Sequence, residues 1–250
     1  MHESDRPGVE YGPVRQVRIA GSGPTVWYGS AGLGARPRSA RGKHSVKRLL
    51  LTHLWDQCRH PGDSADTGLF PLAHEFLGAD HLGRPIISAE VPGGLAVSFS
   101  ACGDDLWAAL SLGSDPVGID AADPREFAGP YPFARVFGAE EWGAALNLVS
   151  GDSLEAAALL WAAKEAATKA LGVGMHFTEP LYVGVEVDAS QTSGNLLRVC
   201  YHGHTGGNTS IDTSSNRGGT RAATEVPVAW ERVAGCYVGV ARYAKRFSEP

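Results

Sequence analysis

The chain has 250 residues, of which 43% are hydrophobic, so it is long enough for one large domain or two smaller ones with a substantial core. Its 22 basic and 27 acidic residues give a net charge of -5 without any basic block, which argues against nucleic acid as a partner. The N-terminus has no apolar signal-peptide region, and no apolar run approaches the roughly 18 residues of a membrane span. We therefore expect a cytoplasmic protein that does not interact with membranes.

The cysteines are widely spaced and form no CxxC pair: Cys58, Cys102, Cys200 and Cys236. None has a histidine partner at the spacing of a zinc finger. We therefore expect four buried thiols that are not bonded to one another.

The first part of the chain predicts an arm, two strands and a helix. Residues 1–15 are expected to form a flexible arm, followed by short strands at Gln16–Ile19 and Thr25–Tyr28. Apolar side chains recur at helical spacing in Ala40–Cys58, with most of its basic residues on other faces. This pattern predicts an amphipathic helix with a basic N-terminal end.

The middle of the chain predicts a hairpin and then a short buried strand. Leu95–Ser100 and Leu106–Leu112 are typical of two strands joined by a tight turn. A third apolar run, Val117–Ile119, ends on Asp120. Asp123 precedes a proline and is expected to cap a turn or helix.

The second half predicts helices followed by strands. Phe133–Leu148 is expected to be helical, and Ser153–Leu171 is a stronger helix prediction because Asp152 or Ser153 can cap it and Gly172 can end it. Strands are expected at Leu181–Val187, Leu197–Tyr201 and Gly235–Ala244, with a loop rich in Gly, Ser, Thr and Asn before the last.

This order of elements does not alternate strand and helix regularly, which favours an α+β fold over a parallel α/β fold. Each half contains strands around one long helix. We expect two similar lobes, residues 16–115 and 116–250, each with a small antiparallel sheet on a long helix. The cleft between them would be the natural binding site.

The helix Ser153–Leu171 carries the most suggestive polar residues. Glu165 and Lys169 project from one face, one turn apart. Alone, they would be an ordinary surface ion pair. Asp120, at the end of its strand, adds a second carboxylate, and two such hard oxygen ligands suit Mg²⁺ together with water and phosphate oxygens.

Four motifs in this order resemble those of the surfactin-type 4′-phosphopantetheinyl transferases. They are Gly83-Arg84-Pro85, Ser98-Phe99-Ser100, Gly118-Ile119-Asp120, and the helical run from Trp161 through Lys164-Glu165 to Lys169. An aromatic and acidic segment, Phe137 to Trp142, lies between the last two. The resemblance extends over about residues 38–244.

The resemblance implies a pseudo-twofold pair of lobes, active as a monomer, with coenzyme A in the cleft. It implies Mg²⁺-dependent transfer of the 4′-phosphopantetheine arm to a serine of an apo acyl or peptidyl carrier protein, with release of 3′,5′-adenosine diphosphate. Such proteins serve polyketide or nonribosomal peptide biosynthesis.

The resemblance also implies roles for individual residues. Asp120 and Glu165 would hold the metal, Glu165 or a water that it orients would be the base, and Lys169 would stabilise the leaving phosphate. Contacts to coenzyme A would come from Arg41, Lys43, Arg84, Ser98, Phe99, Ser100, Lys164 and Lys169. Lys164 could instead be structural.

Two positions depart from the family pattern. Ala122 stands where many members have a second acidic residue, and Phe99 stands where the family usually has a histidine that contacts the coenzyme A 3′-phosphate. Arg41, Lys43 or Arg84 could supply the missing charge. The alternative is a diverged member that binds a carrier protein or a coenzyme A-like ligand without transferring the arm, or performs another reaction in the same cleft.

Overall fold

The computed structural model describes residues 9–19, 24–33, 40–58, 77–80, 84–87, 93–175, 178–187, 195–202 and 223–244. Within these ranges, no helix is both long and apolar enough to cross a membrane.

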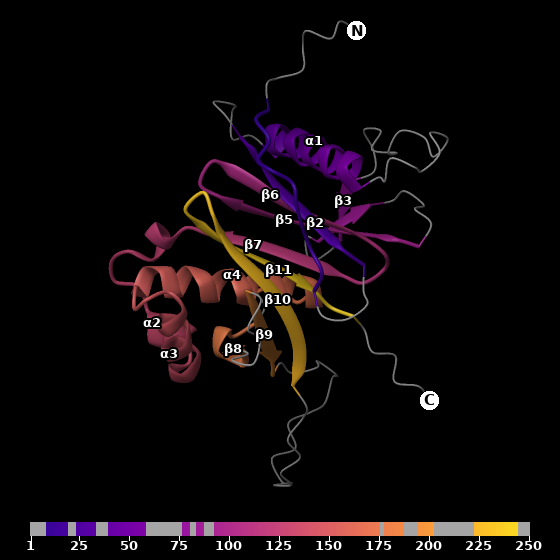
Figure 1. The fold of residues 1–250 in the computed structure, drawn as a ribbon. Helices are drawn as coiled ribbons and strands as arrows, with labels where there is room; N and C mark the ends of the chain where they lie inside the picture. The colour runs from indigo at the N-terminus through magenta and orange to yellow at the C-terminus, as the bar shows by residue number, and fades with distance from the viewer. Residues whose placement is uncertain are drawn as a thin grey trace, which may run out of the picture.

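The first sheet is antiparallel and has the strand order β1-β2-β6-β5. Its strands are β1 (Arg15–Val17), β2 (Val26–Gly32), β5 (Leu95–Cys102) and β6 (Asp105–Leu112). The helix α1 (Ala40–Cys58) covers one face of this sheet and buries Val46, Leu50, Leu51 and Leu54 against it. Figure 1 shows α1 lying across these strands. A separate two-stranded hairpin consists of β3 (Leu77–Ala79) and β4 (Pro85–Ile87).

The second sheet is also antiparallel and has the strand order β7-β11-β10-β9-β8. Its strands are β7 (Val117–Ala122), β8 (Val183–Val187), β9 (Leu196–Tyr201), β10 (Thr224–Val233) and β11 (Cys236–Arg242). The helix α4 (Ser153–Leu171) packs on this sheet, with the short helices α2 (Phe133–Val136) and α3 (Ala139–Leu148) beside it. The expected α+β class with antiparallel sheets is confirmed, whereas the pseudo-twofold relation and the domain boundaries stay predictions.

Local signals set both ends of α4. The Asp152 carboxylate accepts hydrogen bonds from the backbone N–H groups of Leu154 and Glu155, at 2.9 and 3.1 Å. Gly172 ends the helix with a φ of 77°, a left-handed conformation that glycine adopts without a Cβ clash. The expected bounds Ser153–Leu171 are confirmed. Most of the buried face consists of alanines, so the helix backbone can approach the sheet closely.

Ser98 and Ser100 join the two sheets. Along β5, the Ser98 hydroxyl oxygen accepts a hydrogen bond from the Ile119 N–H at 3.1 Å, and the Ser100 hydroxyl oxygen accepts one from the Ala121 N–H at 3.3 Å. Both donors belong to β7, so these hydroxyls satisfy strand N–H groups that face the neighbouring strand β5. The two sheets thereby meet at β5 and β7.

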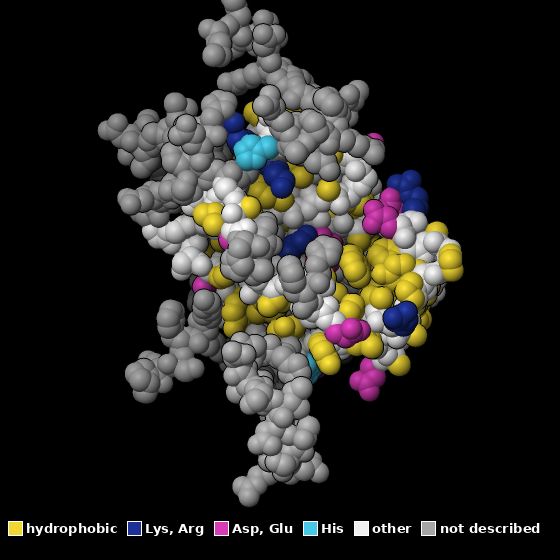
Figure 2. Space-filling model, turned by 180° about the vertical axis from the view of Figure 1, so that it is seen from behind, with side chains coloured by type: hydrophobic (Ala, Val, Ile, Leu, Met, Phe, Trp, Pro, Cys, Tyr) yellow, Lys and Arg dark blue, Asp and Glu magenta, His cyan; other side chains and the backbone are white. Residues whose placement is uncertain are grey.

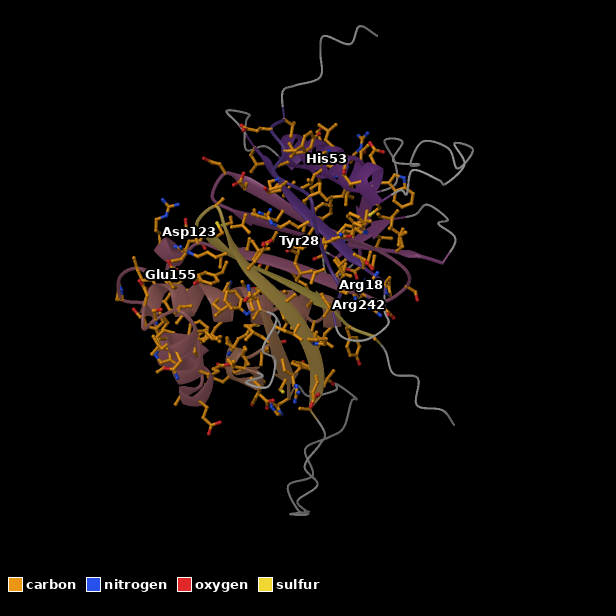
Figure 3. The ribbon with its side chains drawn as sticks, viewed as in Figure 1. Arg18, Tyr28, His53, Asp123, Glu155 and Arg242 are labelled. Carbon is orange, nitrogen blue, oxygen red and sulfur yellow. A yellow bond between two sulfur atoms is a disulfide. The ribbon has the colours of Figure 1, made fainter. Side chains whose placement is uncertain are left out.

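A second link between the sheets joins β1 and β2 of the first sheet to β10 of the second. The Tyr28 hydroxyl of β2 donates to Glu231 of β10 at 2.7 Å, and the Arg15 guanidinium pairs with the same carboxylate at 2.9 Å. Tyr28 is labelled in Figure 3. Burial, reinforced by the Glu231 charge, raises the pKa of the Tyr28 phenol well above its usual value. The tyrosine therefore remains a hydrogen-bond donor at neutral pH.

The expectation of four unbonded thiols is wrong for two of them. Cys102, at the end of β5, forms a disulfide with Cys236, at the start of β11, whereas Cys58 and Cys200 are buried thiols. The bridge joins residues 134 positions apart, at the tips of two hairpins on different sheets. Widely separated cysteines carry no signal of such a pairing in one sequence.

Three further expectations need correction or completion. The helix expected over Phe133–Leu148 is two helices, because the chain leaves the helical conformation at Phe137 and Gly138. β10 lies between the expected loop and the last strand, in a segment for which we expected no strand. At the end of the expected arm, Gly12 donates to the Ser30 carbonyl at 2.9 Å, so this part is paired with β2, and residues 1–8 lie outside the described ranges.

Candidate functional site

A cleft of about 720 Å³ lies where the two sheets meet. Its walls come from α1, the β3–β4 hairpin, β5, the start of β7 and the C-terminal end of α4. Apolar side chains line much of it, among them Val97, Ile86, Val117 and Met175. The space-filling view in Figure 2 shows basic side chains and a histidine among hydrophobic ones on one face of the molecule.

Close packing of β7 against α4 brings the expected catalytic residues together. A Cβ on Gly118 would lie only 1.9 Å from the carbonyl oxygen of Ala166, and one on Gly239 only 2.7 Å from that of Ala162. Only glycine allows this approach. As a result, α4 can carry Glu165 and Lys169 next to the strand that carries Asp120.

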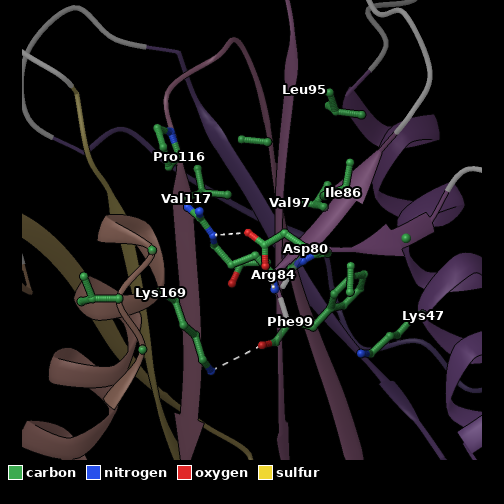
Figure 4. Close-up of a pocket in the computed structure, with 18 of the residues that line it drawn as sticks. Lys47, Asp80, Arg84, Ile86, Leu95, Val97, Phe99, Pro116, Val117 and Lys169 are labelled. Carbon is green, nitrogen blue, oxygen red and sulfur yellow. Dashed lines mark hydrogen bonds and ion pairs between the residues drawn. The ribbon is translucent and has the colours of Figure 1, made fainter. Parts of the chain in front are cut away.

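Asp120 and Lys169 form an ion pair next to this cleft, which Lys169 lines. The Lys169 ammonium donates to the Asp120 carboxylate at 2.7 Å, and to the carbonyl oxygens of Ile119 at 3.1 Å and Phe99 at 3.4 Å. Figure 4 shows the lysine reaching from α4 toward β5. Lys169 and Glu165 both line the cleft, whereas the Asp120 side chain is only 8% exposed.

Ser100 also bonds Asp120. Its hydroxyl donates to the same carboxylate oxygen, Oδ1, at 2.7 Å while it accepts from the Ala121 N–H. Burial raises the pKa of Asp120 above its usual range, and the charge of Lys169 and its hydrogen bonds oppose that shift. Ser98 and Ser100 were expected to contact coenzyme A. In the structure both hydroxyls are bonded to β7, and Ser98 also lines the cleft.

Arg84 lies in the cleft wall beside the end of α4. Its guanidinium pairs with Asp80 at 2.8 Å, and the Asp80 carboxylate also accepts from the Arg84 backbone N–H (Figure 4). A Cβ on Gly172 would lie 2.1 Å from the guanidinium, so the arginine packs directly on the last turn of the helix. The negative end of the helix dipole favours a cation there.

Phe99 also lies in the cleft, and α1 supplies a cation next to it. The Lys47 ammonium lies 4.9 Å from the centre of the Phe99 ring, within the range of a cation–π contact (Figure 4). His44, one turn earlier on α1, lines the same cleft. The compensating charge was expected at Arg41, Lys43 or Arg84, and neither Lys47 nor His44 was named. Arg84 lines the cleft, whereas the side chains of Arg41 and Lys43 lie outside the described part of the structure.

Lys164 does not belong to this cleft. Its side chain is fully buried, and its ammonium donates to Glu141 at 2.5 Å and to the carbonyl oxygens of Val136 and Pro180 at 2.9 and 3.2 Å. Burial lowers the pKa of this lysine, and Glu141 opposes that shift. All three of its donors bond protein acceptors in the core, which favours the structural role over the expected coenzyme A contact.

Glu141, in the acidic segment before α4, has a structural role. Its carboxylate accepts from the backbone N–H groups of Gly138 and Val185, each at 2.7 Å, and from Lys164. One side chain thus joins α3, α4 and β8.

The tryptophans near the site are packing residues, with Trp107 buried and Trp142 and Trp161 in aromatic contacts.

The donor set tests whether a divalent metal suits the site. Among the described residues, no three His, Cys, Asp or Glu side chains group closely enough to hold a metal ion. Asp123, the nearest further carboxylate in the chain, caps the 3-10 helix Pro124–Phe127, as expected, and pairs with Arg125. Asp120 and Glu165 therefore remain as two hard oxygen donors, which Mg²⁺ accepts when water and phosphate oxygens complete its coordination.

Comparison with known proteins finds a family match in the second half of the chain. No curated protein matches the sequence significantly. Residues 116–224 match the family model of the 4′-phosphopantetheinyl transferase superfamily, and this range includes Asp120, Glu165 and Lys169. The match points to a transferase of the phosphopantetheinyl transferase kind.

Proposed function

We propose that the protein transfers 4′-phosphopantetheine from coenzyme A to a serine of an apo acyl or peptidyl carrier protein, in a Mg²⁺-dependent reaction. The observation that carries the proposal is the ion pair between Asp120 of β7 and Lys169 of α4. Lys169 and Glu165 line the adjoining cleft, which is large enough for a cofactor-sized ligand. The family match supports the general reaction type.

In the proposed reaction, the carrier serine oxygen attacks the phosphorus that bears the pantetheine arm. The bond from that phosphorus to the bridging oxygen breaks, and 3′,5′-adenosine diphosphate leaves with the electron pair. Glu165, or a water that it orients, accepts the serine proton. Lys169 stabilises negative charge on the leaving phosphate.

Asp120 and Glu165 would hold the metal, which when bound neutralises the pyrophosphate charge. The rest of the cleft would orient the ligand. Arg84 and Lys47 stand on two walls and can each attract a phosphate, while Val97, Ile86 and Met175 offer apolar surface to the less polar parts.

The alternative is a diverged protein that binds a carrier protein or a coenzyme A-like ligand without transferring the arm. Phe99 favours this alternative because its ring lines the cleft and offers no hydrogen bond to a phosphate. The two functions differ in whether the phosphopantetheine arm is transferred to the carrier protein, which can be measured.

The deciding experiment incubates the full chain with coenzyme A, Mg²⁺ and a panel of apo carrier proteins, followed by intact-mass measurement. Transfer predicts a mass gain of one phosphopantetheinyl group, which a carrier with its acceptor serine replaced by alanine must not show. Asp120→Asn and Glu165→Gln should abolish the gain and remain folded. Absence of the gain on every carrier, together with measurable coenzyme A binding, would favour the diverged function.

A further inference from the structure

The contacts of Lys169 leave no donor for a ligand. An ammonium has three N–H groups. Those of Lys169 are directed at Asp120 Oδ1, the Ile119 carbonyl and the Phe99 carbonyl, at 2.7, 3.1 and 3.4 Å. Yet the side chain lines the cleft and is 28% exposed, which makes it accessible to an anion there.

Asp120 explains why the lysine turns inward. The carboxylate is buried, and a buried carboxylate is costly unless a positive charge lies next to it. Ser100 donates a hydrogen bond to Oδ1 but carries no charge. Lys169 bonds the same oxygen and supplies the opposite charge.

We propose that Lys169 occupies the place of the divalent cation in the ligand-free protein, and that Asp120 exchanges this ammonium for the metal when coenzyme A binds. The inference rests on the proposed function, because it assigns Asp120 to the metal. After the exchange, the Lys169 ammonium turns toward the cleft and meets the phosphate. No covalent bond changes in this step.

The exchange keeps Asp120 paired with a positive charge in both states. It also makes the metal and coenzyme A help each other bind. A metal that arrives alone must displace Lys169, and the ammonium then has no carboxylate partner at 2.7 Å. An anionic ligand accepts the displaced ammonium, so each ligand lowers the free energy of binding of the other, and the coupling is reciprocal.

The test measures Mn²⁺ affinity without coenzyme A, by electron paramagnetic resonance of the unbound ion, for the wild type, Lys169→Met and Lys47→Met. Removal of the competing ammonium should tighten Mn²⁺ binding by about tenfold or more. Lys47→Met is the matched control, because it removes one positive charge from the same cleft but its ammonium contacts Phe99. Its Mn²⁺ affinity should stay within about twofold of the wild type, as expected for a charge beyond direct contact.

The three outcomes are distinct. Tighter Mn²⁺ binding by Lys169→Met alone supports the exchange. Equal or weaker binding by Lys169→Met, in a wild type that binds Mn²⁺ and transfers the arm, overturns the exchange and leaves the proposed function standing. No Mn²⁺ binding by the wild type, with or without coenzyme A, overturns both. Equal tightening in both variants overturns the exchange in favour of a general charge effect.

A second measurement uses the wild type, in case Lys169→Met does not fold. Brief acetylation followed by peptide mass spectrometry reports how readily each lysine amine reacts. Mn²⁺ together with 3′,5′-adenosine diphosphate changes the reactivity of every amine that the nucleotide contacts. Mn²⁺ alone acts on Lys169 by displacing its ammonium from Asp120. Under the exchange, Mn²⁺ alone increases the acetylation of Lys169 and leaves that of Lys47 unchanged. Unchanged or reduced Lys169 acetylation at saturating Mn²⁺ would contradict the inference.

Discussion

Gly118 of β7 lies directly against the main chain of Ala166 in α4, since a Cβ on the glycine would be 1.9 Å from the alanine carbonyl oxygen. Ala166 follows Glu165 in the chain, and Asp120 lies two residues after Gly118. The glycine of the Gly-Ile-Asp motif therefore sets how closely the two proposed metal-binding carboxylates approach. Gly118 has this role because it lacks a side chain.

Gly118→Ala should destabilise the protein and abolish transfer. A methyl group cannot fit at 1.9 Å from a backbone oxygen, so α4 must move away from β7. Overpacking of this kind typically costs about 1–3 kcal/mol and sometimes more. Urea unfolding followed by tryptophan fluorescence would measure the loss.

The matched control is Gly143→Ala. Gly143 lies in the interior of the α3 sequence and on its exposed face, and a Cβ there meets no atom within 4 Å. Alanine is the better helix former, by about 1 kcal/mol, so this change should leave stability equal or higher. Destabilisation of similar size in both variants would contradict the packing role of Gly118.

Ser100→Ala should lower the rate of transfer more than Ser98→Ala does. Both hydroxyls accept an N–H of β7, so each loss should cost about 1–3 kcal/mol of stability. Only Ser100 also donates to Asp120. Ser100→Thr keeps the hydroxyl and should restore most of kcat. Equal kcat losses in the two alanine variants, measured on the folded fraction, would show that Ser100 does not position the carboxylate.

Lys164→Met should destabilise the protein. It should not weaken coenzyme A binding by the fraction that remains folded. Removal of one partner of a buried ion pair leaves the Glu141 carboxylate without its cation, which typically costs about 3–5 kcal/mol. The double variant Lys164→Met with Glu141→Gln should recover part of that loss. Calorimetry at a temperature where Lys164→Met is folded checks the coenzyme A affinity. A large loss of affinity there would restore the ligand contact that the sequence suggested for Lys164.

The four cysteines should fall into two classes on alkylation. Burial raises the pKa of Cys58 to about 12, and burial with the nearby Glu186 charge raises that of Cys200 to about 11. Since the thiolate is the nucleophile, both should react slowly in the folded protein at pH 8, and faster only as the pH approaches those values. Unfolding without reductant should expose two reactive thiols, and unfolding with reductant four. Four without reductant would exclude the Cys102–Cys236 disulfide.

The same bridge should add stability. It closes a loop between residues 134 positions apart, and a loop of that length corresponds to roughly 4–5 kcal/mol in the chain-entropy account. Reductant should therefore lower the midpoint of thermal unfolding in the wild type and leave a Cys102→Ala, Cys236→Ala variant unaffected.

Elements with local signals in the sequence could be predicted. The ends of α4 depend on Asp152 and Gly172, each within a few residues of the helix, and α1 depends on apolar spacing alone. The split between α2 and α3 also had a local signal, since Gly138 followed by Glu141 is typical of a new helix start. The prediction of a single helix over Phe133–Leu148 did not take this signal into account.

Contacts between distant segments were out of reach. Nothing near Lys164 in the chain indicates that Glu141 and two carbonyl groups will enclose its ammonium. Likewise, Lys47 comes to lie over Phe99 only because α1 packs on the first sheet. The helix Ser153–Leu171 presents Lys164 and Lys169 on different faces, and only the packing shows which one lies in the cleft.

Phe99→His with Lys47 intact tests how this chain recognises the 3′-phosphate of coenzyme A. If Lys47 already supplies the charge that the family takes from a histidine, the substitution removes the cation–π contact at 4.9 Å and adds a second donor. The wild type should then prefer coenzyme A to dephospho-coenzyme A, because one charge-assisted hydrogen bond is worth about 1.5–3 kcal/mol, or roughly 10- to 100-fold in Kd. Calorimetry with the two ligands measures this ratio.

Lys47→Gln should reduce the ratio toward one, and Phe99→His in the Lys47→Gln background should restore part of it. Arg135→Gln, which removes an exposed charge on α2 outside the cleft residues, is the control and should leave the ratio unchanged. A wild type that binds the two ligands equally, and gains the preference only on Phe99→His, would show that Lys47 does not replace the histidine. In that case the phenylalanine itself would mark a cleft that no longer recognises the 3′-phosphate.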